Sequence, residues 1–214
     1  MTQTNPTPER DLGKRLTLVT ALVGLVIVAM LVAWQLRPRT VEEAVGPTPL
    51  GFGNPTSPKQ VVAFLSPTCP HCARFELGAG RNFYARAEAG EFYYAVYPLM
   101  LEDDREAYTL AFFCAYKQNA LPVFALLHYQ NYYLGQNLGL AELAERAEME
   151  PATFRRCLEA PATQRDMQAS IRWMQTLDVP GTPTFFVRDS GSDLYRRVRG
   201  NRDEDFWNRW LRAD

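Results

Sequence analysis

The chain has 214 residues, of which 47% are hydrophobic, and a formal net charge of −1 at pH 7. This length is sufficient for one domain of ordinary size with a substantial core. No long basic stripe is present, which argues against nucleic-acid binding.

Residues 16–36, LTLVTALVGLVIVAMLVAWQL, contain no charged residue. A run of about 20 apolar residues can cross the hydrocarbon core of a bilayer as a helix. A cleaved signal peptide is the alternative, but its apolar region is usually only about 7–15 residues and a small-x-small site follows it. The sequence WQLRPRTVEE offers no such site. The run therefore predicts an uncleaved transmembrane anchor that contacts lipid, preceded by a cytoplasmic tail over residues 1–15.

The charges around this run bear on its orientation. More basic residues precede it than follow it: Arg10, Lys14 and Arg15 against Arg37 and Arg39. This bias favours an inside N-terminus and places the rest of the chain on the extracytoplasmic side, periplasmic or extracellular, of the cell membrane. Residues 37–59 are rich in Pro, Gly and Thr and predict a linker.

The part after the linker begins with a β-α-β pattern over residues 60–102. The apolar run QVVAFLS at 60–66 predicts a buried strand, residues 70–89 are compatible with a helix, and EFYYAVYPL at 91–99 predicts a second strand. A parallel pair is the default for such a unit.

The remainder of the chain divides into two parts. Residues 103–177 have apolar residues at helical spacing, interrupted by Pro, Gly and Asn, and predict a helical block. Residues 178–214 predict a strand at 184–188, a second strand at 194–200 and an amphipathic closing helix. The class is therefore α/β with a helical insertion.

The segment SPTCPHC carries the chemistry, because Cys69 falls where the first strand ends and a helix begins. The free N–H groups and partial positive charge of a helix N-terminus favour a thiolate, and Pro70 suits the first helical turn. His71 adds a cation or a hydrogen-bond donor. Thiols in such places have pKa values of roughly 3.5–7.5. Cys72, one turn later, is placed to resolve a mixed disulfide on Cys69.

Two other interpretations of the pair are weaker. A closed zinc site needs four ligands, and beyond Cys69, Cys72 and His71 the sequence offers only His128 and no second C-x-x-C, so no metal site is predicted. A structural disulfide across so small a ring closes little chain and has small entropic value. A C-x-x-C near a β-α-β pattern is typical of a thioredoxin-like redox motif.

The segment GNPTSPKQVVAFLSPTCPHC, together with GTPTFFV after the helical block, resembles the DsbA-like branch of thioredoxin-fold proteins. The resemblance covers residues 51–213. It implies a thioredoxin-like fold interrupted by a helical insertion, and a cis-proline loop at Thr182 and Pro183 beside the cysteines. In such proteins the backbone of the residue before the cis-proline binds an extended substrate segment, which assigns substrate binding to these two residues.

The resemblance also bears on the two remaining cysteines. Cys114 and Cys157 fall on predicted helices of the block, where several relatives have cysteines and some have them bonded. Two buried free thiols are the alternative. A bond would close a loop worth roughly 4 kcal/mol in the chain-entropy model. An even number of cysteines outside the membrane fits an oxidising compartment.

The chain departs from the family pattern in two places. Relatives often carry a buried acid six residues before the first cysteine, which helps to move the proton of the second; here that residue is Ala63. Proton transfer then uses water or another group, or is slower. The best-known oxidases have Val before the cis-proline, whereas this chain has Thr182, which leaves the substrate preference open.

The expected function is that of a membrane-anchored thiol-disulfide oxidoreductase without a cofactor, acting on unfolded or reduced secreted and envelope proteins. Cys69, Cys72, His71 and Pro70 are its expected catalytic residues. By resemblance, a membrane partner of DsbB or VKOR type reoxidises the pair. The alternatives are a reductase or isomerase of the same fold, a copper chaperone that binds through Cys69 and Cys72, and an anchored scaffold without activity.

Overall fold

The computed structural model describes residues 9–36, 40–100 and 106–213, with the side chains of the first helix described only for 18–32. The chain forms two compact units, which divide between residues 39 and 40.

The first unit consists of helix α1 (Glu9–Leu36). Its described side chains, 18–32, are all exposed and mostly apolar. Among the residues that the structure describes, no helix combines the length and the apolarity needed to cross a membrane. The charged residues used to predict the orientation lie outside the described side chains: Arg10, Lys14, Arg15, Arg37 and Arg39.

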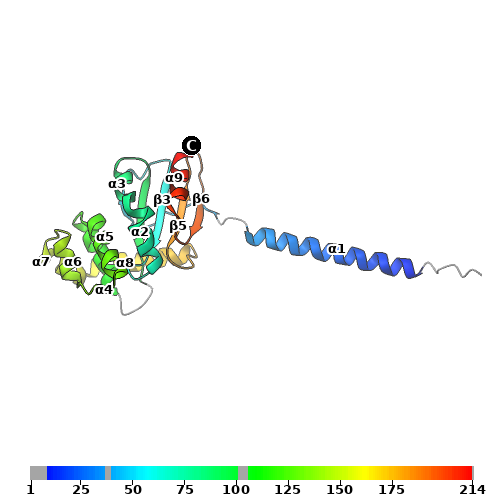
Figure 1. Cartoon of the computed structure of the whole chain (residues 1–214), viewed down its shortest axis with the longest axis horizontal. Helices are drawn as coiled ribbons and strands as arrows, with labels where there is room; N and C mark the ends of the chain where they lie inside the picture. Colours follow the sequence, from blue (N-terminus) through cyan, green and yellow to red (C-terminus); the bar gives the residue numbers. More distant parts are fainter. Residues whose placement is uncertain (1–8, 37–39, 101–105, 214) are drawn as a thin grey trace, which may run out of the picture. The chain divides into compact units, whose positions relative to one another are not determined.

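The second unit is built on a six-stranded sheet with the order β1-β6-β5-β3-β4-β2 (Figure 1). The strands are β1 (Thr40–Val41), β2 (Leu50–Phe52), β3 (Gln60–Leu65), β4 (Tyr93–Pro98), β5 (Thr184–Arg188) and β6 (Tyr195–Arg199). Only β3 and β4 run parallel; the other pairs are antiparallel. Every residue of β3 is buried, which explains why this strand is almost continuously apolar.

The segment predicted to be a linker, residues 37–59, is in large part a piece of the domain. It supplies β1, which pairs with β6, and β2, which pairs with β4. Ala44, Leu50 and Phe52 are buried in the core. The abundance of Pro and Gly suggested a flexible segment, but these residues form turns around two very short strands, whose sequence signal is weak.

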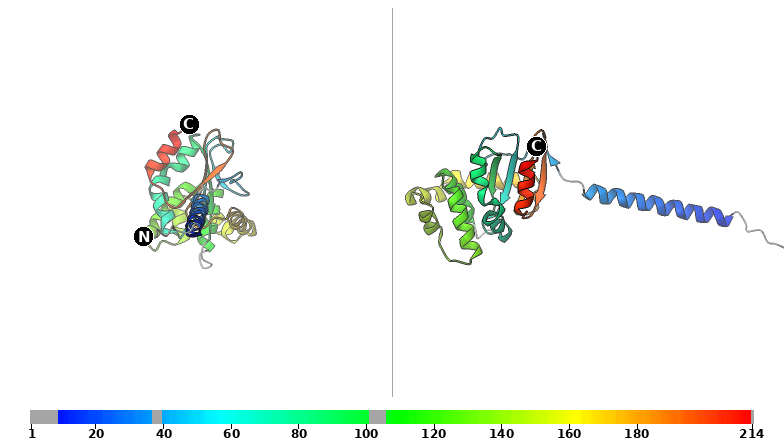
Figure 2. Two further views of the ribbon diagram at one scale, coloured as in Figure 1. Left: turned by 90° about the vertical axis from the view of Figure 1, so that its right-hand side faces the viewer. Right: turned by 45° about the horizontal axis from the view of Figure 1, so that its top comes forward.

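Three helices and a short 3-10 turn cover one face of the sheet. They are α2 (Pro70–Leu77), the turn η1 (Ala79–Asn82), α3 (Phe83–Glu88) and α9 (Glu204–Arg212). The predicted helix 70–89 is thus interrupted at Gly78. Trp207 of α9 is 1% exposed and packs edge-to-face on Phe83 and Phe185. The last helix, α9, therefore lies against the sheet (Figures 1 and 2).

The helical insertion lies between β4 and β5 and confirms the predicted block. Its helices are α4 (Glu106–Lys117), α5 (Leu121–Tyr133), α6 (Leu140–Arg146), α7 (Pro151–Glu159) and α8 (Pro161–Thr176). Proline stands in the first turn of α5, α7 and α8, where its missing N–H costs no helical hydrogen bond. Helix α5 packs against α2, while the end of α8 contributes Trp173 and Met174 to the second face of the sheet.

Candidate active site

Cys69 stands at the junction between β3 and α2. It is the N-cap residue of α2, with an extended backbone (φ −94°, ψ 120°), and Pro70 occupies the first helical turn. Cys69 is 8% exposed, whereas Pro70 and His71 are exposed. The parallel β3–β4 pair and the helix that follows it therefore present the first thiol at the carboxyl end of the sheet, where α/β proteins commonly place their sites.

The surroundings of Cys69 stabilise its thiolate. A hydrogen bond from the Cys72 thiol makes the largest contribution and lowers the pKa of Cys69. Burial opposes this shift, whereas hydrogen bonds from Thr182 and from the backbone N–H groups of Cys72 and His71 add to it. The pKa of Cys69 is thereby lowered from 9.0 to about 5. The two backbone donors belong to the first turn of α2, whose N–H groups have no partners within the helix. At pH 7 this sulfur is predominantly a thiolate, which is the nucleophilic form.

Cys72 lies one turn further on and is fully buried. Burial, together with the neighbouring Cys69 thiolate, raises the pKa of Cys72 well above 9.0. Its sulfur accepts a hydrogen bond from the Ser66 backbone N–H at 3.4 Å. The pair is thus asymmetric, with one acidic, partly accessible sulfur and one buried sulfur that holds its proton.

The loop before β5 completes the arrangement on the other side of the sulfurs. The Thr182–Pro183 peptide bond is cis, and Cys69 Sγ lies 3.3 Å from the Thr182 carbonyl oxygen, to which it donates a hydrogen bond when it carries its proton. Thr182 and Cys69 are 113 residues apart in sequence, so only the fold brings them together.

The loop before Cys69 is held in place by α5. Three consecutive carbonyl groups of this loop meet side chains of that helix: the Tyr129 hydroxyl donates to Ser66 at 3.2 Å, His128 Nε2 lies 2.9 Å from the oxygen of Pro67, and the Tyr132 hydroxyl donates to Thr68 at 2.6 Å. The helical insertion therefore fixes the backbone that leads into the reacting cysteine.

A buried carboxyl group that the sequence analysis did not single out lies on the same helix as the pair. Glu76 is 2% exposed, and burial raises its pKa to about 8, although hydroxyl donors from Tyr84 and Tyr94 at 3.4 Å oppose the rise. Glu76 follows Cys72 by four residues on α2, so the two side chains share one face of the helix. The spacing C-x-x-C-x-x-x-E was the signal that could have revealed it.

The other two cysteines are bonded to each other. Cys114 of α4 and Cys157 of α7 form a disulfide with a Cα–Cα distance of 5.7 Å. Both lie in the helical insertion, and Cys114 is completely buried. Cys69 and Cys72 are free thiols in the structure. Among the described residues no group of three or more His, Cys, Asp or Glu side chains could hold a metal ion.

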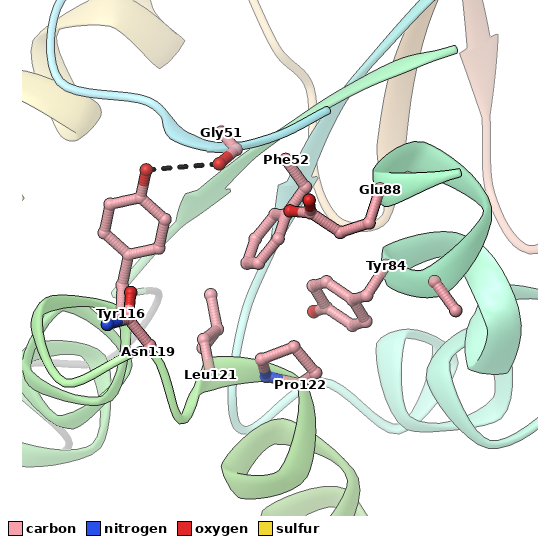
Figure 3. Close-up of a pocket in the computed structure, with 9 residues that line it drawn as sticks. Gly51, Phe52, Tyr84, Glu88, Tyr116, Asn119, Leu121 and Pro122 are labelled. Atoms are coloured by element: carbon pink, nitrogen blue, oxygen red, sulfur yellow. Dashed lines mark hydrogen bonds between the residues drawn. The ribbon is translucent and has the colours of Figure 1, made fainter. Parts of the chain in front are cut away.

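A pocket of about 540 Å³ opens between β2, α3 and the junction of α4 with α5 (Figure 3). Phe52, Tyr84 and Leu121 form much of its wall, and the Tyr116 hydroxyl donates to the Gly51 carbonyl oxygen at 3.1 Å across one side. Neither cysteine of the C-x-x-C pair lines it. The pocket therefore does not belong to the thiol site.

The comparisons with known proteins agree with this geometry. A family model described as thioredoxin matches residues 46–209. No protein of curated function matches the chain by sequence.

Several solved structures share its fold. A thioredoxin-like oxidoreductase from Silicibacter pomeroyi is 21% identical, with a TM-score of 0.60 over 78% of this chain and 91% of that one. Oxidised BdbD from Bacillus subtilis is 17% identical, with a TM-score of 0.62 over 79% and 96%. The alpha-DsbA1 protein of Wolbachia pipientis is also 17% identical, with a TM-score of 0.63 over 78% and 90%.

The family match covers most of the chain, including the C-x-x-C helix, the helical insertion and the cis-proline loop. The chain belongs to the thioredoxin family and is a DsbA-like thiol-disulfide oxidoreductase whose C-x-x-C pair is Cys69 and Cys72.

Proposed function

We propose that this protein is a membrane-anchored, extracytoplasmic oxidant that introduces disulfides into reduced secreted or envelope proteins through Cys69 and Cys72. The low pKa of Cys69, about 5, is the observation that supports the oxidising direction of the exchange reaction. Stabilising this thiolate stabilises the reduced protein, and a protein whose reduced form is favoured is a stronger oxidant.

In the forward reaction, a substrate thiolate attacks Cys69 Sγ of the Cys69–Cys72 disulfide. The Cys69–Cys72 bond breaks, Cys72 leaves as a thiolate and takes up a proton, and a mixed disulfide joins the substrate to Cys69. A second substrate thiolate then attacks the substrate sulfur of that bond and releases the Cys69 thiolate. The substrate loses two electrons, and the Cys69–Cys72 pair gains them.

The substrate segment is proposed to lie along the cis-proline loop. The Thr182 carbonyl group is 3.3 Å from Cys69 Sγ, so a backbone bound to this loop is next to the reacting sulfur. Pro70 and the N–H groups of the first turn of α2 hold Cys69 at the helix start. His71 contributes its backbone N–H, and its side chain is exposed to solvent.

Glu76 is proposed to exchange the proton of Cys72, in the absence of an acid at position 63. The basis is burial of both groups on one face of α2, together with a carboxyl pKa of about 8, which lets Glu76 exchange a proton near neutral pH. Replacing Glu76 by Gln should slow the attack of Cys72 on the mixed disulfide at Cys69 at pH 7. Alkylation of Cys69 should keep its wild-type rate. An equal decrease in the rates of both reactions would show that Glu76 has only a structural role.

The anchor is proposed to be residues 16–36, inserted with the N-terminus inside. Its support is the run of 21 residues without a charge and the exposed apolar side chains of 18–32. The bonded Cys114–Cys157 pair fits an oxidising compartment. Reoxidation is assigned to a membrane partner of DsbB or VKOR type. Membrane fractionation with protease treatment of spheroplasts tests the anchor and its orientation. A catalytic domain that is soluble or protected from the protease would rule out the proposed anchor and orientation.

The deciding experiment for the redox direction is a titration of the Cys69–Cys72 pair against glutathione, read by mass after acid quenching and alkylation. An oxidant reaches half-reduction at a potential well above that of thioredoxin, which is about −270 mV. A value at or below that of thioredoxin would instead indicate a reductase. The Cys69→Ser variant is the control, because it cannot form the pair.

A further inference from the structure

The pocket of about 540 Å³ in Figure 3 lies where the helical insertion meets the part of the domain built on the sheet. Strand β2 and helix α3 supply one side, and the junction of α4 with α5 supplies the other. Ligand sites commonly have volumes of about 300–1,000 Å³, lie between structural units and have mostly apolar walls with few polar groups. The pocket has these properties, although it is separate from the thiol site.

The apolar surface of the pocket is built around Phe52. The ring of Tyr84 lies 4.9 Å from the ring of Phe52, and the ring of Tyr116 lies 5.7 Å from it, both edge-to-face. Phe52 and Tyr84 are almost fully buried, whereas Tyr116 and Pro122 are partly exposed. A ligand in the pocket therefore contacts chiefly the side chains of Tyr116 and Pro122, which the buried rings hold in place.

The charge at the pocket comes from Glu88 of α3. Its side chain is exposed and points toward Phe52 in Figure 3. Among the described residues that line the pocket, Glu88 is the only charged one. It forms no ion pair within the described part of the chain, and its basic neighbour Arg86 is bonded to Glu91 at 2.7 Å. The pocket thus combines an apolar wall with one carboxylate that is available to a cation.

We propose that this pocket binds a small organic cation, namely an ammonium group carried on an apolar body. The ammonium group pairs with the Glu88 carboxylate, and the apolar body lies against Tyr116 and Pro122. The inference goes beyond the proposed oxidoreductase function and does not depend on it, because neither Cys69 nor Cys72 lines the pocket.

Other occupants fit these walls less well. Glu88 would repel an anion, and a neutral apolar molecule would displace water from this carboxylate without replacing its interactions. A peptide could add to the edge strand β2 only through free backbone groups, but the Gly51 carbonyl oxygen already accepts the Tyr116 hydroxyl at 3.1 Å. The charge and the bonded strand edge therefore favour a small cation over a peptide strand.

The test compares three ligands that share one aromatic body. These are 2-phenylethylamine, which is protonated at pH 7, the neutral 2-phenylethanol and the anionic phenylacetate. Isothermal titration calorimetry measures their binding to the full-length protein in non-ionic detergent at low salt. The amine should bind about two to five times more tightly than the alcohol, as expected for one exposed ion pair, and phenylacetate should bind most weakly.

Variants locate this preference in the pocket. Glu88→Gln keeps the size of the side chain and removes its charge, so the amine should bind only as tightly as the alcohol does. Glu145→Gln makes the same change in net charge at an exposed residue of α6 outside the pocket, and it should keep the preference. Ala85→Trp narrows the pocket from its exposed position on α3 and should weaken the binding of both ligands.

Equal affinities for the amine and the alcohol in the wild type would overturn the proposal, as would a preference that survives Glu88→Gln or is lost in Glu145→Gln. Binding that is unchanged in Ala85→Trp would place the ligand outside the pocket, in the detergent or elsewhere on the protein, and would also refute it. A capped Gly-Lys-Gly peptide that binds where the free amine does not would show that the occupant is a protein side chain and that the small-molecule site is wrong. Oxidation of a peptide dithiol should proceed at the wild-type rate in Glu88→Gln, so a failure of this site is distinct from a failure of the redox function.

Discussion

Cys69 and Cys72 are three residues apart at the start of α2, whereas Cys114 and Cys157 are 43 residues apart and join α4 to α7. The first pair lies at a helix N-terminus, beside a loop from the other end of the domain, and its two sulfurs have pKa values shifted in opposite directions. The second pair lies inside the helical insertion and is bonded.

The difference between the pairs shows how position determines the task of a cysteine. A bond between Cys114 and Cys157 constrains a long loop of the unfolded chain, which is how a disulfide stabilises a fold. A bond between Cys69 and Cys72 closes almost no chain, but its reduction releases a thiolate that the helix start stabilises. The first pair is therefore suited to exchange and the second to stability.

Replacing the cysteines of the first pair should have the largest effect. Cys69→Ser should abolish oxidation of a peptide dithiol, because the variant cannot form the disulfide that accepts the two electrons of the substrate. Incubated with oxidised glutathione, Cys72→Ser should instead accumulate a mixed disulfide between Cys69 and glutathione, with release of one reduced glutathione, because no second thiol resolves it; intact mass and peptide mapping would detect it. A mixed disulfide that accumulates on Cys72 in the Cys69→Ser variant would reverse the assigned roles.

Removing the second pair should affect stability and leave the exchange reaction in place. The double variant Cys114→Ser/Cys157→Ser should lose about 4 kcal/mol of unfolding free energy, measured by urea denaturation, because a 43-residue loop is no longer closed. The potential of the Cys69–Cys72 pair should match that of the wild type. A shift beyond about 30 mV, tenfold in the two-electron equilibrium, would show that the two regions are coupled.

The pH dependence of stability separates the reduced from the oxidised protein. In the reduced form, Cys69 loses its proton at about pH 5 when folded but near pH 9 when unfolded. Between these values the unfolded state binds more protons, so the stability of the reduced form rises with pH. The oxidised form lacks this titration. Thermal unfolding of both forms should show the reduced protein gaining stability relative to the oxidised one from pH 5 to pH 9, and losing that gain as the pH falls again. Parallel curves would contradict the low pKa of Cys69.

The exposed imidazole of His71 should have the smallest effect. His71→Ala retains the backbone N–H that contributes to the low pKa of Cys69 and removes only a side chain that solvent screens. The potential should fall by less than about 30 mV, which makes the variant a slightly weaker oxidant. Titration against glutathione measures this shift. An unchanged or raised potential would show that the imidazole does not stabilise the thiolate.

Much of the active site could be predicted from local sequence. The C-P-H-C segment predicted a thiol pair at a helix start, since a strand ending in Ser-Pro and a proline in the first helical turn are local signals. The family pattern did not predict a role for Glu76, because that pattern has its buried acid six residues before the first cysteine, where this chain has Ala63. Its burial depends on Tyr84 and Tyr94, which come from other elements.

The sequence by itself determined the order of the elements, the helical insertion and the identity of the reacting cysteines, because each depends on apolar periodicity or residue types close together in the chain. Only the tertiary structure decided the rest. Strands β1 and β2 are too short to have a pattern of their own and exist because longer strands pair with them. Thr182 reaches Cys69 across 113 residues of chain, a contact that the family resemblance implied but no local pattern encodes. His128 reaches the loop before Cys69 across 61 residues, and nothing in the sequence pointed to that contact. Contacts over such separations are made by the packing of the sheet and helices, and no local signal encodes them.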